Sequence, residues 1–258
     1  MLSFVEQRRD ELLGKEFKTK NFGKCFVIDY KGNRDVTVMF YEPKAVVKCQ
    51  FGALNDGLVK NPYYPSFYGV GYIGDGKYSG RDKEAYGRWT SILGRAYCEK
   101  YKNRFPAYRD VTVCKEWHNF QNFAEWYCSQ KFSTTKVVGG RNYHLDKDLL
   151  QKGSKVYSPE TCCFIPSEIN NLITTNKSRR GKYPIGVCYH KTAKVFVASI
   201  NREKGTKNLG RFTNPTEAFQ AYKEAKESYI KEVAEIWKDR IDERVYQALL
   251  NYEVLIDD

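Results

Sequence analysis

Apolar and polar residues alternate along positions 185–212 in three short runs, and each run predicts a β-strand. The runs are 185–190, 194–200 and 208–212. The middle run alternates most regularly, with Val195 and Val197 on one face and Phe196 and Ala198 on the other. The polar turns at 191–193 and 202–206 are short enough for hairpins. The stretch therefore predicts a three-stranded antiparallel sheet.

A helix is predicted directly after these strands. Asn214 is a favourable N-cap, Pro215 suits the first helical position, and Glu217 completes a spacing like that of a capping box. The apolar side chains that follow recur at helical spacing, at Ala218, Ala221, Tyr222, Ala225 and Tyr229. The helix can therefore cover one face of the sheet.

The charge of this region indicates its partner. The chain of 258 residues has 43 Lys and Arg, 31 Asp and Glu, and a formal net charge of +12. Between 177 and 211, Glu203 is the single carboxylate against ten cations: Lys177, Arg179, Arg180, Lys182, Lys191, Lys194, Arg202, Lys204, Lys207 and Arg211. Phosphates are the natural counter-charge. We therefore expect double-stranded DNA as the partner; the alternative is a structural domain with a solvated basic face.

The region resembles the plant Apetala-two/ethylene-response-factor DNA-binding domain, which also occurs in phage and mobile-element endonucleases. The resemblance rests on Ile185-Gly186-Val187, the run 195–200, Leu209-Gly210-Arg211-Phe212 and the helix motif at 217–222. Phe196 stands where that family usually has Trp, so no target sequence is implied. In that family the sheet enters the major groove. The resemblance and the basic linker before it together imply DNA contacts at Arg179, Arg180, Lys182, His190, Lys194, Arg202, Lys207 and Arg211.

The N-terminal part predicts a small β-domain. A short charged helix at residues 1–11 precedes strand-like runs at 15–17, 24–30, 36–40 and 45–49. So many short strands within 50 residues suggest a small SH3-like barrel, which we place in residues 1–62. Such barrels bind nucleic acid, bind peptides or only pack, so its role stays open.

Two aromatic helices are predicted in the middle of the chain, at 83–102 and 114–130. The residues expected in the core are Ala85, Trp89, Ile92, Leu93 and Ala96 of the first helix and Trp117, Phe120, Phe123, Ala124 and Tyr127 of the second. The glycine-dense loop at 69–78 before them lacks the Lys-Ser/Thr ending of a phosphate-binding loop, so we assign it to tight turns. The eight cysteines are scattered without a Cys-x-x-Cys pair and are expected to be reduced thiols of the core. A zinc site at Cys98, Cys114, His118 and Cys128 lacks compact ligand spacing.

Ionisable residues gather at 143–148, which predicts a strand followed by a second strand at 155–157 and a helix that begins near Ser167. A hairpin that leads into a short helix is the layout of a ββα-metal site. Such a site needs one strand carboxylate and one helical Asn or His to hold Mg²⁺, and a neighbouring base to activate water. The residue types here fit in part.

This segment resembles the HNH nuclease motif of phage homing endonucleases. By position, the resemblance implies that Asp146 and Asn170 bind the metal, that Lys147 stands where the catalytic His is expected, and that Thr161 stands where the loop Asn is expected. A neutral lysine base requires a strongly lowered pKa, which an adjacent Asp148 opposes. His144 lies on the same strand face as Asp146 and is the alternative base.

Together these motifs predict an α+β protein of three parts, at 1–62, 63–175 and 176–258. The arrangement resembles mobile HNH endonucleases of tailed bacteriophages and implies a metal-dependent, site-preferring DNA endonuclease with Mg²⁺ or another divalent cation. Two alternatives stay open: a non-catalytic DNA-binding or regulatory protein on a nuclease-derived scaffold, and a protein-binding inhibitor with an acidic partner. The apolar face at 232–252 either packs on the body or forms a homodimer.

The location in the cell follows from two further patterns. The N-terminus becomes charged too early for a signal peptide, and no apolar run approaches the roughly 20 residues that span a bilayer. We therefore expect a soluble cytoplasmic protein, in the host cytoplasm if it is phage-encoded, with no membrane partner.

Overall fold

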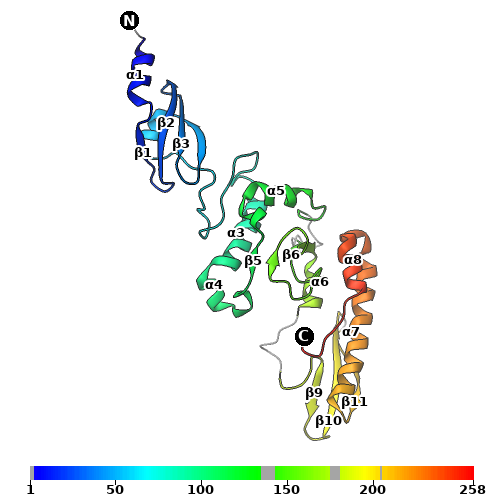
Figure 1. Ribbon diagram of the computed structural model, residues 1–258. Coiled ribbons are helices and arrows are strands. Elements are labelled where there is room, and N and C mark those ends of the chain that lie inside the picture. The colour runs from blue at the N-terminus through cyan, green and yellow to red at the C-terminus, as the bar shows by residue number, and fades with distance from the viewer. Residues whose placement is uncertain (1–2, 135–142, 175–180, 204) are drawn as a thin grey trace. The chain divides into compact units, whose positions relative to one another are not determined.

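The computed structural model describes residues 3–134, 143–174, 181–203 and 205–258. It has mixed α+β architecture, as predicted (Figure 1). The chain divides into two compact units, one of residues 1–129 with 155–157 and the other of residues 130–154 with 158–258. The predicted boundaries after residues 62 and 175 fall inside these units and stay predictions.

The first unit begins with helix α1 (Phe4–Leu12), which agrees with the short helix predicted at the N-terminus. Ser3 and Glu6 form a reciprocal capping box at its start. An antiparallel sheet follows in the order β1-β2-β3-β4, then helix α2 (Phe51–Asn55). Its strands are β1 (Glu16–Lys18), β2 (Lys24–Gly32), β3 (Asp35–Phe40) and β4 (Ala45–Cys49).

The sheet of the first unit buries a core of its own. Every second residue of β3 is fully buried, which is the expected pattern for a strand with one face on the core. β1 pairs only with β2, and β4 only with β3, so both lie at the edges of the sheet. All four predicted strands are present, but within the described residues they form no closed barrel.

The rest of the first unit is built around aromatic helices. Its elements are α3 (Lys83–Tyr97), α4 (Glu99–Arg104), η1 (Pro106–Tyr108), β5 (Thr112–Val113), η2 (Lys115–His118), α5 (Phe120–Ser129) and β7 (Val156–Tyr157). The two predicted helices are each interrupted, at Cys98 and at Asn119, because these residues adopt extended backbone angles. Every predicted core side chain of both helices is nevertheless buried, so the apolar spacing was informative even where the helix ends were not.

The glycine-dense loop is held by one side chain of α5. Gln121 donates from Nε2 to the carbonyl oxygens of Ile73 (3.0 Å) and Tyr78 (2.8 Å), and its Oε1 accepts from the amide of Tyr78 (3.0 Å). A Cβ on Gly74 would lie 2.2 Å from Oδ1 of Asn119. Gly74 therefore allows the loop to pack closely against Asn119. This agrees with the tight turns that the sequence predicts for the loop.

The second unit begins with a ββα element. β6 (His144–Asp146) pairs antiparallel with β8 (Cys163–Ile165), and α6 (Ser167–Ile173) follows directly and contacts β6. The predicted hairpin partner is wrong, because β7 instead runs parallel to β5 in the first unit. β8 is buried at all three positions, and this continuous apolar run lacks the alternation that would reveal a strand.

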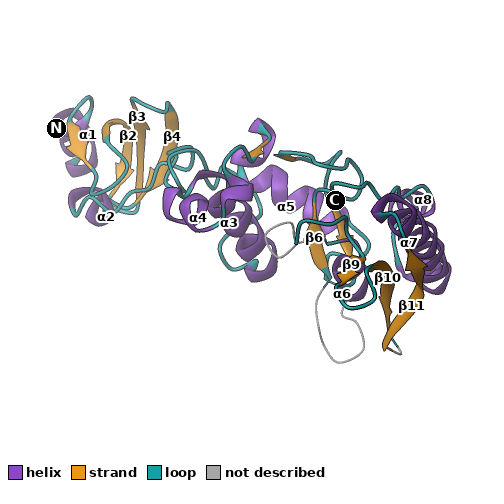
Figure 2. Ribbon diagram, turned by 90° about the horizontal axis from the view of Figure 1, so that it is seen from below, coloured by secondary structure: helices purple, strands orange, loops and turns teal. Residues whose placement is uncertain are grey.

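A three-stranded antiparallel sheet and a long helix follow, as predicted from the sequence. The sheet has the order β11-β10-β9, with β9 (Val187–His190), β10 (Val195–Arg202) and β11 (Gly205–Phe212). Helix α7 (Pro215–Trp237) contacts all three strands and lies beside the sheet (Figure 1 and Figure 2). Asn214 caps α7 by accepting from the amide of Thr216, as expected for an N-cap.

Helix α7 takes part in two cores. Its N-terminal half packs with Phe219 and Tyr222 against Ile200 of the sheet. Its C-terminal half packs with Ile230 and Ala234 in one core that also contains the ββα element and α8. After α7 the chain forms η4 (Lys238–Arg240) and then α8 (Glu243–Leu250). A single helix therefore links the sheet to the ββα element.

The apolar face of α8 is buried within the chain itself. Val245 and Leu249 have no exposed surface, and Tyr246 donates a hydrogen bond from its hydroxyl to Glu235 of α7. Packing on the body accounts for this face without a second copy. Oligomerisation through the C-terminal helix stays a prediction.

The cysteines are less uniformly buried than predicted. All eight are free thiols, but Cys128 and Cys188 are exposed. Both lie on the solvent side of an element whose other side carries the core, so scattered cysteines are a poor indicator of burial. Within the described residues, every helix is too short or too polar to cross a membrane.

Gly186→Ala is expected to destabilise the second unit by about 3 kcal/mol or more. Gly186 has φ +76°, and a Cβ there would lie 2.0 Å from Cδ2 of Tyr222. A positive φ costs about 1–2 kcal/mol for alanine, and overpacking adds about 1–3 kcal/mol. Chemical denaturation followed by circular dichroism measures the loss.

The matched control is Gly153→Ala. Gly153 has the same φ of +76° but no atom within 4 Å of an added Cβ, so this variant carries the backbone cost alone. Equal losses in the two variants would contradict close packing of Tyr222 on Gly186.

Candidate functional site

The C-terminal sheet has one covered and one open face. Ala198 and Ile200 are buried under α7, so by strand alternation Val197, Ser199 and Asn201 lie on the opposite face. We call this the open face. It consists of Cys188, His190, Val195, Val197, Ser199, Asn201, Thr206, Asn208 and Arg211.

The strand register places two predicted DNA contacts on the open face. Arg211 lies opposite Val197, and His190 lies opposite Val195; both are exposed. Lys194 lies in the exposed turn between β9 and β10 with φ +55°. The register therefore brings Arg211 and His190 to the open face, and Lys194 lies in the turn at the end of its strands.

Arg202 and Lys207 belong to the other side. Lys207 lies opposite Ile200, and Arg202 is two residues beyond Ile200 on the same strand face. The Arg202 guanidinium lies over the Tyr229 ring at 4.6 Å, and its Nη1 is 3.1 Å from Oε2 of Glu232. Arg202 thus ties the sheet to α7 and is not part of the open face.

The linker cations can be placed only in part. Arg179 and Arg180 lie outside the described residues. Lys182 is exposed, and its ammonium lies 5.6 Å from the centre of the Tyr183 ring. It lies three residues before the first aliphatic residue that packs on the sheet core, Ile185.

Charge is distributed unequally about the sheet. The described strand residues of the open face include no Asp or Glu. Helix α7, on the covered side, carries a shallow surface formed by four glutamates and one lysine, Glu224, Glu227, Glu232, Glu235 and Lys231. Two of these glutamates are paired, Glu232 with Arg202 and Glu227 with Lys223. A polyanion is therefore expected to prefer the open face to the α7 side.

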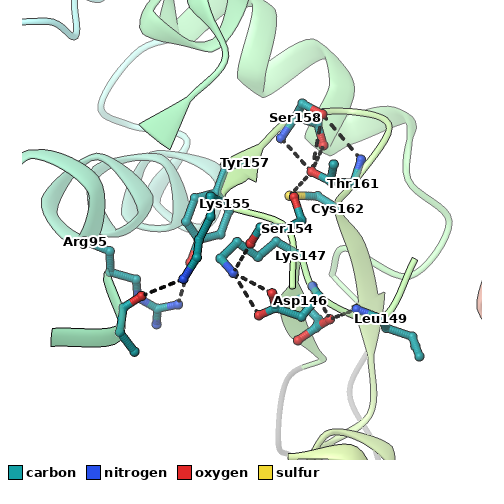
Figure 3. Close-up of polar contacts among 12 residues, drawn as sticks. Arg95, Asp146, Lys147, Leu149, Ser154, Lys155, Tyr157, Ser158, Thr161 and Cys162 are labelled. Carbon is teal, nitrogen blue, oxygen red and sulfur yellow. Dashed lines mark hydrogen bonds and ion pairs between the residues drawn. The ribbon is translucent and has the colours of Figure 1, made fainter. Parts of the chain in front are cut away.

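The candidate metal site lies at the end of β6 (Figure 3). Oδ1 of Asp146 accepts hydrogen bonds from the amides of Asp148 (2.9 Å) and Leu149 (2.7 Å), which turns the chain away from the strand. The carboxylate forms no other hydrogen bond to the residues that the structure describes. Burial raises the pKa of Asp146 despite these two amides. A bound cation would relieve that cost.

Asn170 lies on the neighbouring element. It is the fourth residue of α6, which contacts β6, and it is half-buried. Its side-chain amide makes no hydrogen bond within the described ranges. A carboxylate and an amide oxygen are the hard oxygen donors that Mg²⁺ prefers, and Mg²⁺ keeps several waters. The donor chemistry therefore fits this ion.

Lys147 is engaged by three acceptors. Its Nζ lies 2.7 and 2.8 Å from the carboxylate oxygens of Asp148 and 2.7 Å from the carbonyl oxygen of Ser154 (Figure 3). The residue is 8% exposed. A general base needs a free lone pair, whereas this ammonium holds the loop after β6. The contacts favour a structural role for Lys147.

The loop position expected for Asn is taken by Thr161. Its buried hydroxyl accepts from the amide of Ser158 at 3.1 Å and so stabilises the turn before β8. His144 is exposed at the start of β6, two residues from Asp146 and therefore on the same strand face. His144 remains the candidate base.

Comparison of the chain with protein-family models, curated proteins and solved structures gives no match. The functional argument therefore rests on residues and geometry. No cluster of three or more His, Cys, Asp or Glu able to hold a metal occurs in the described part of the chain. A site formed by one carboxylate and one amide is smaller than such a cluster.

The long helix is predicted only in part. The segment 232–252 is expected to continue the helix that begins at Pro215, and no Gly or Pro follows Pro215 in the sequence. The structure has one helix as far as Trp237, after which the chain passes through η4 before α8. That this one helix packs on both the sheet and the ββα element was not predicted.

Proposed function

We propose that this protein is a metal-dependent, site-preferring DNA endonuclease of the HNH type. The observation that carries the proposal is the half-buried Asp146 carboxylate at the end of β6, with a raised pKa and with Asn170 on the helix that contacts this strand. The open face supports duplex binding. Helix α7, which packs on both elements, holds the bound duplex in a defined relation to Asp146.

Each residue has a distinct role in the proposed reaction. Asp146 and Asn170 would hold Mg²⁺, which would supply positive charge to neutralise the scissile phosphate and the leaving oxygen. His144 accepts the proton of the attacking water. The water oxygen bonds to phosphorus, the bond from phosphorus to the leaving oxygen breaks, and that oxygen is protonated by solvent. Lys147 and Thr161 stabilise the loop that carries these groups.

A second candidate function is duplex binding without cleavage on the same scaffold. The observation that favours it is the Lys147 ammonium, which stands where the family has its catalytic His and is fully occupied by Asp148 and Ser154. In that case Asp146 serves only to cap the turn after β6.

Nicking of supercoiled plasmid distinguishes the two functions. The full chain is expected to nick the plasmid with Mg²⁺ and to leave it intact with excess EDTA. Tight, salt-sensitive duplex binding without nicking in any divalent metal would favour the second function. Absence of duplex binding at low salt would contradict both and favour an acidic protein partner.

Neutralising one cation of the open face and one of the turn between β9 and β10 is expected to weaken DNA binding selectively. Lys194→Gln combined with Arg211→Gln should lower the slope of log K against log salt by about 2, since each lost phosphate contact removes about 0.9. The affinity for a duplex, measured by fluorescence anisotropy, should fall with it.

The matched control removes the same charge from the covered side, by Arg202→Gln with Lys207→Gln. Its slope should change by less than about 1, because these cations do not face the DNA. Equal changes in both double variants would mean that only net charge matters. That result would contradict binding through the open face.

A further inference from the structure

A second cluster of cations occurs in the first unit, around α4 and η1. It consists of Lys100, Lys102, Arg104 and Arg109, with Lys155 just before β7. We call it the α4 cluster. Lys155 joins it through a hydrogen bond from Nζ to the carbonyl oxygen of Ala107, at 3.4 Å. Four of the five side chains are exposed and Lys102 is half-buried.

The segment of the α4 cluster also contains two carboxylates, Glu99 and Asp110, but neither forms an ion pair with a cation of the cluster. None of its five cations is within ion-pair distance of a carboxylate among the described residues. Elsewhere in the same unit, by contrast, Arg9 and Lys31 pair with Asp29, Lys24 pairs with Glu16, and Lys77 pairs with Glu125. Like charges kept close together destabilise the folded state, so an external counter-charge is the natural explanation.

Packed aromatic side chains lie within the segment that carries the α4 cluster. Tyr101 packs against Phe105 and Tyr108, with ring centres 4.8 and 5.3 Å apart. Arg104 lies over the Phe105 ring at 5.3 Å. Arg95 donates a hydrogen bond to the hydroxyl of Tyr157 at 3.4 Å, near Lys155 (Figure 3). The backbone of the segment is therefore positioned before any partner arrives, which lowers the entropic cost of binding.

We propose that the α4 cluster is a second DNA contact, which binds the phosphate backbone of the duplex. The proposal rests on the proposed function. Helix α4 buries no side chain, and Phe105 is the one large apolar residue of 99–110 that is markedly exposed, at 40%. A protein interface requires a larger apolar centre. Unpaired lysines and arginines in this density fit phosphates, which they bind without base specificity.

The position of Lys155 connects the α4 cluster to the cutting chemistry. It belongs to the loop that joins β6 to β8, and its neighbour Ser154 accepts the hydrogen bond from Lys147. The chain that leaves Asp146 therefore enters the cluster nine residues later, at Lys155.

Two variants with the same change in charge test the proposal. The cluster variant combines Lys100→Gln, Lys102→Gln, Arg104→Gln and Arg109→Gln; the control combines Arg9→Gln, Lys24→Gln, Lys31→Gln and Lys77→Gln. Duplex binding of the full-length proteins is measured by anisotropy from 50 to 300 mM NaCl. The slope of log K against log salt should fall by about 3 in the cluster variant and by less than about 1 in the control.

The outcomes are separable. The second contact is overturned if the two variants have equal slopes or if the slope of the cluster variant is unchanged. The proposed function stays intact in that case, provided that the wild type binds the duplex. Failure of the wild type to bind any duplex instead removes the proposed function and the second contact with it. Thermal melts of both variants, and retention of the wild-type circular dichroism spectrum, verify that the fold persists.

Discussion

Asp146→Asn is expected to reduce Mg²⁺-dependent nicking by more than about 100-fold, because loss of a direct ligand should exceed the 10- to 100-fold cost of losing an outer-shell partner. The amide keeps an oxygen that accepts from the amides of Asp148 and Leu149, so the turn after β6 is preserved. The charge that holds the cation is lost. Duplex affinity should stay within about twofold of the wild type, since no phosphate-binding cation changes.

The same variant has an expected effect on stability. Burial raises the pKa of Asp146 in the folded state, so the folded protein binds more protons than the unfolded chain between the ordinary value of 3.8 and the raised value. Stability therefore falls as pH rises through that window, and above the raised pKa of Asp146 the penalty is fully present. Without metal at pH 7, Asp146→Asn should melt at a higher temperature than the wild type.

Magnesium reverses this order. Mg²⁺ binds the folded wild type and raises its melting temperature by mass action, whereas the Asn variant should respond little. Differential scanning fluorimetry with a Mg²⁺ titration measures both effects. Full nicking by Asp146→Asn, or an equal Mg²⁺ response in the two proteins, would show that this carboxylate is only a cap.

Trp89→Ala is expected to lower the free energy of unfolding of the first unit by about 3–5 kcal/mol, the usual cost of truncating a buried tryptophan. Trp89 has no exposed surface and contacts the rings of Phe67, Tyr86 and Phe120. Its Nε1 donates to the carbonyl oxygen of Trp117 at 2.7 Å. Since domains are stable by only about 5–15 kcal/mol, this loss should leave the unit partly unfolded at 37 °C.

Two controls identify the cause of the loss. Trp89→Phe keeps most of the ring contacts but leaves the carbonyl of Trp117 without this donor, so it should cost less than the alanine variant. Phe4→Ala removes an aromatic side chain that is 74% exposed and should change stability by less than about 0.5 kcal/mol. Urea denaturation followed by tryptophan fluorescence measures all three; equal losses would contradict an aromatic core.

Local patterns were sufficient for much of the fold. The alternation at 194–200 and the cap at Asn214 each predict an element that is present, because strand and helix periods depend on neighbours in sequence. Core side chains such as Trp89 and Phe120 were also identified correctly, since their spacing records which face of a helix is buried. Helix ends were less accurate, as the interruptions at Cys98 and Asn119 illustrate.

The candidate sites depended more on long-range pairing. The sequence identified Asp146 and Asn170, but it paired the first strand with 155–157 where the structure pairs it with Cys163–Ile165. It also grouped Arg202 with Arg211, although strand register puts them on opposite faces. A buried strand with no alternation and a bulge between Ala198 and Ser199 both leave no unambiguous local signal.

By itself, therefore, the sequence determined the N-terminal strands, the C-terminal sheet with its helix, and the positive charge of the C-terminal region, because periodicity, caps and composition are local properties of a chain. Only the tertiary structure decided that Lys147 is occupied by Asp148 and Ser154, that α7 joins the sheet to the ββα element, and that cations remain unpaired around α4. The first fact depends on the conformation of the loop after β6, and the other two concern contacts between residues distant in sequence or the absence of such contacts. Only folding determines which of these distant groups meet.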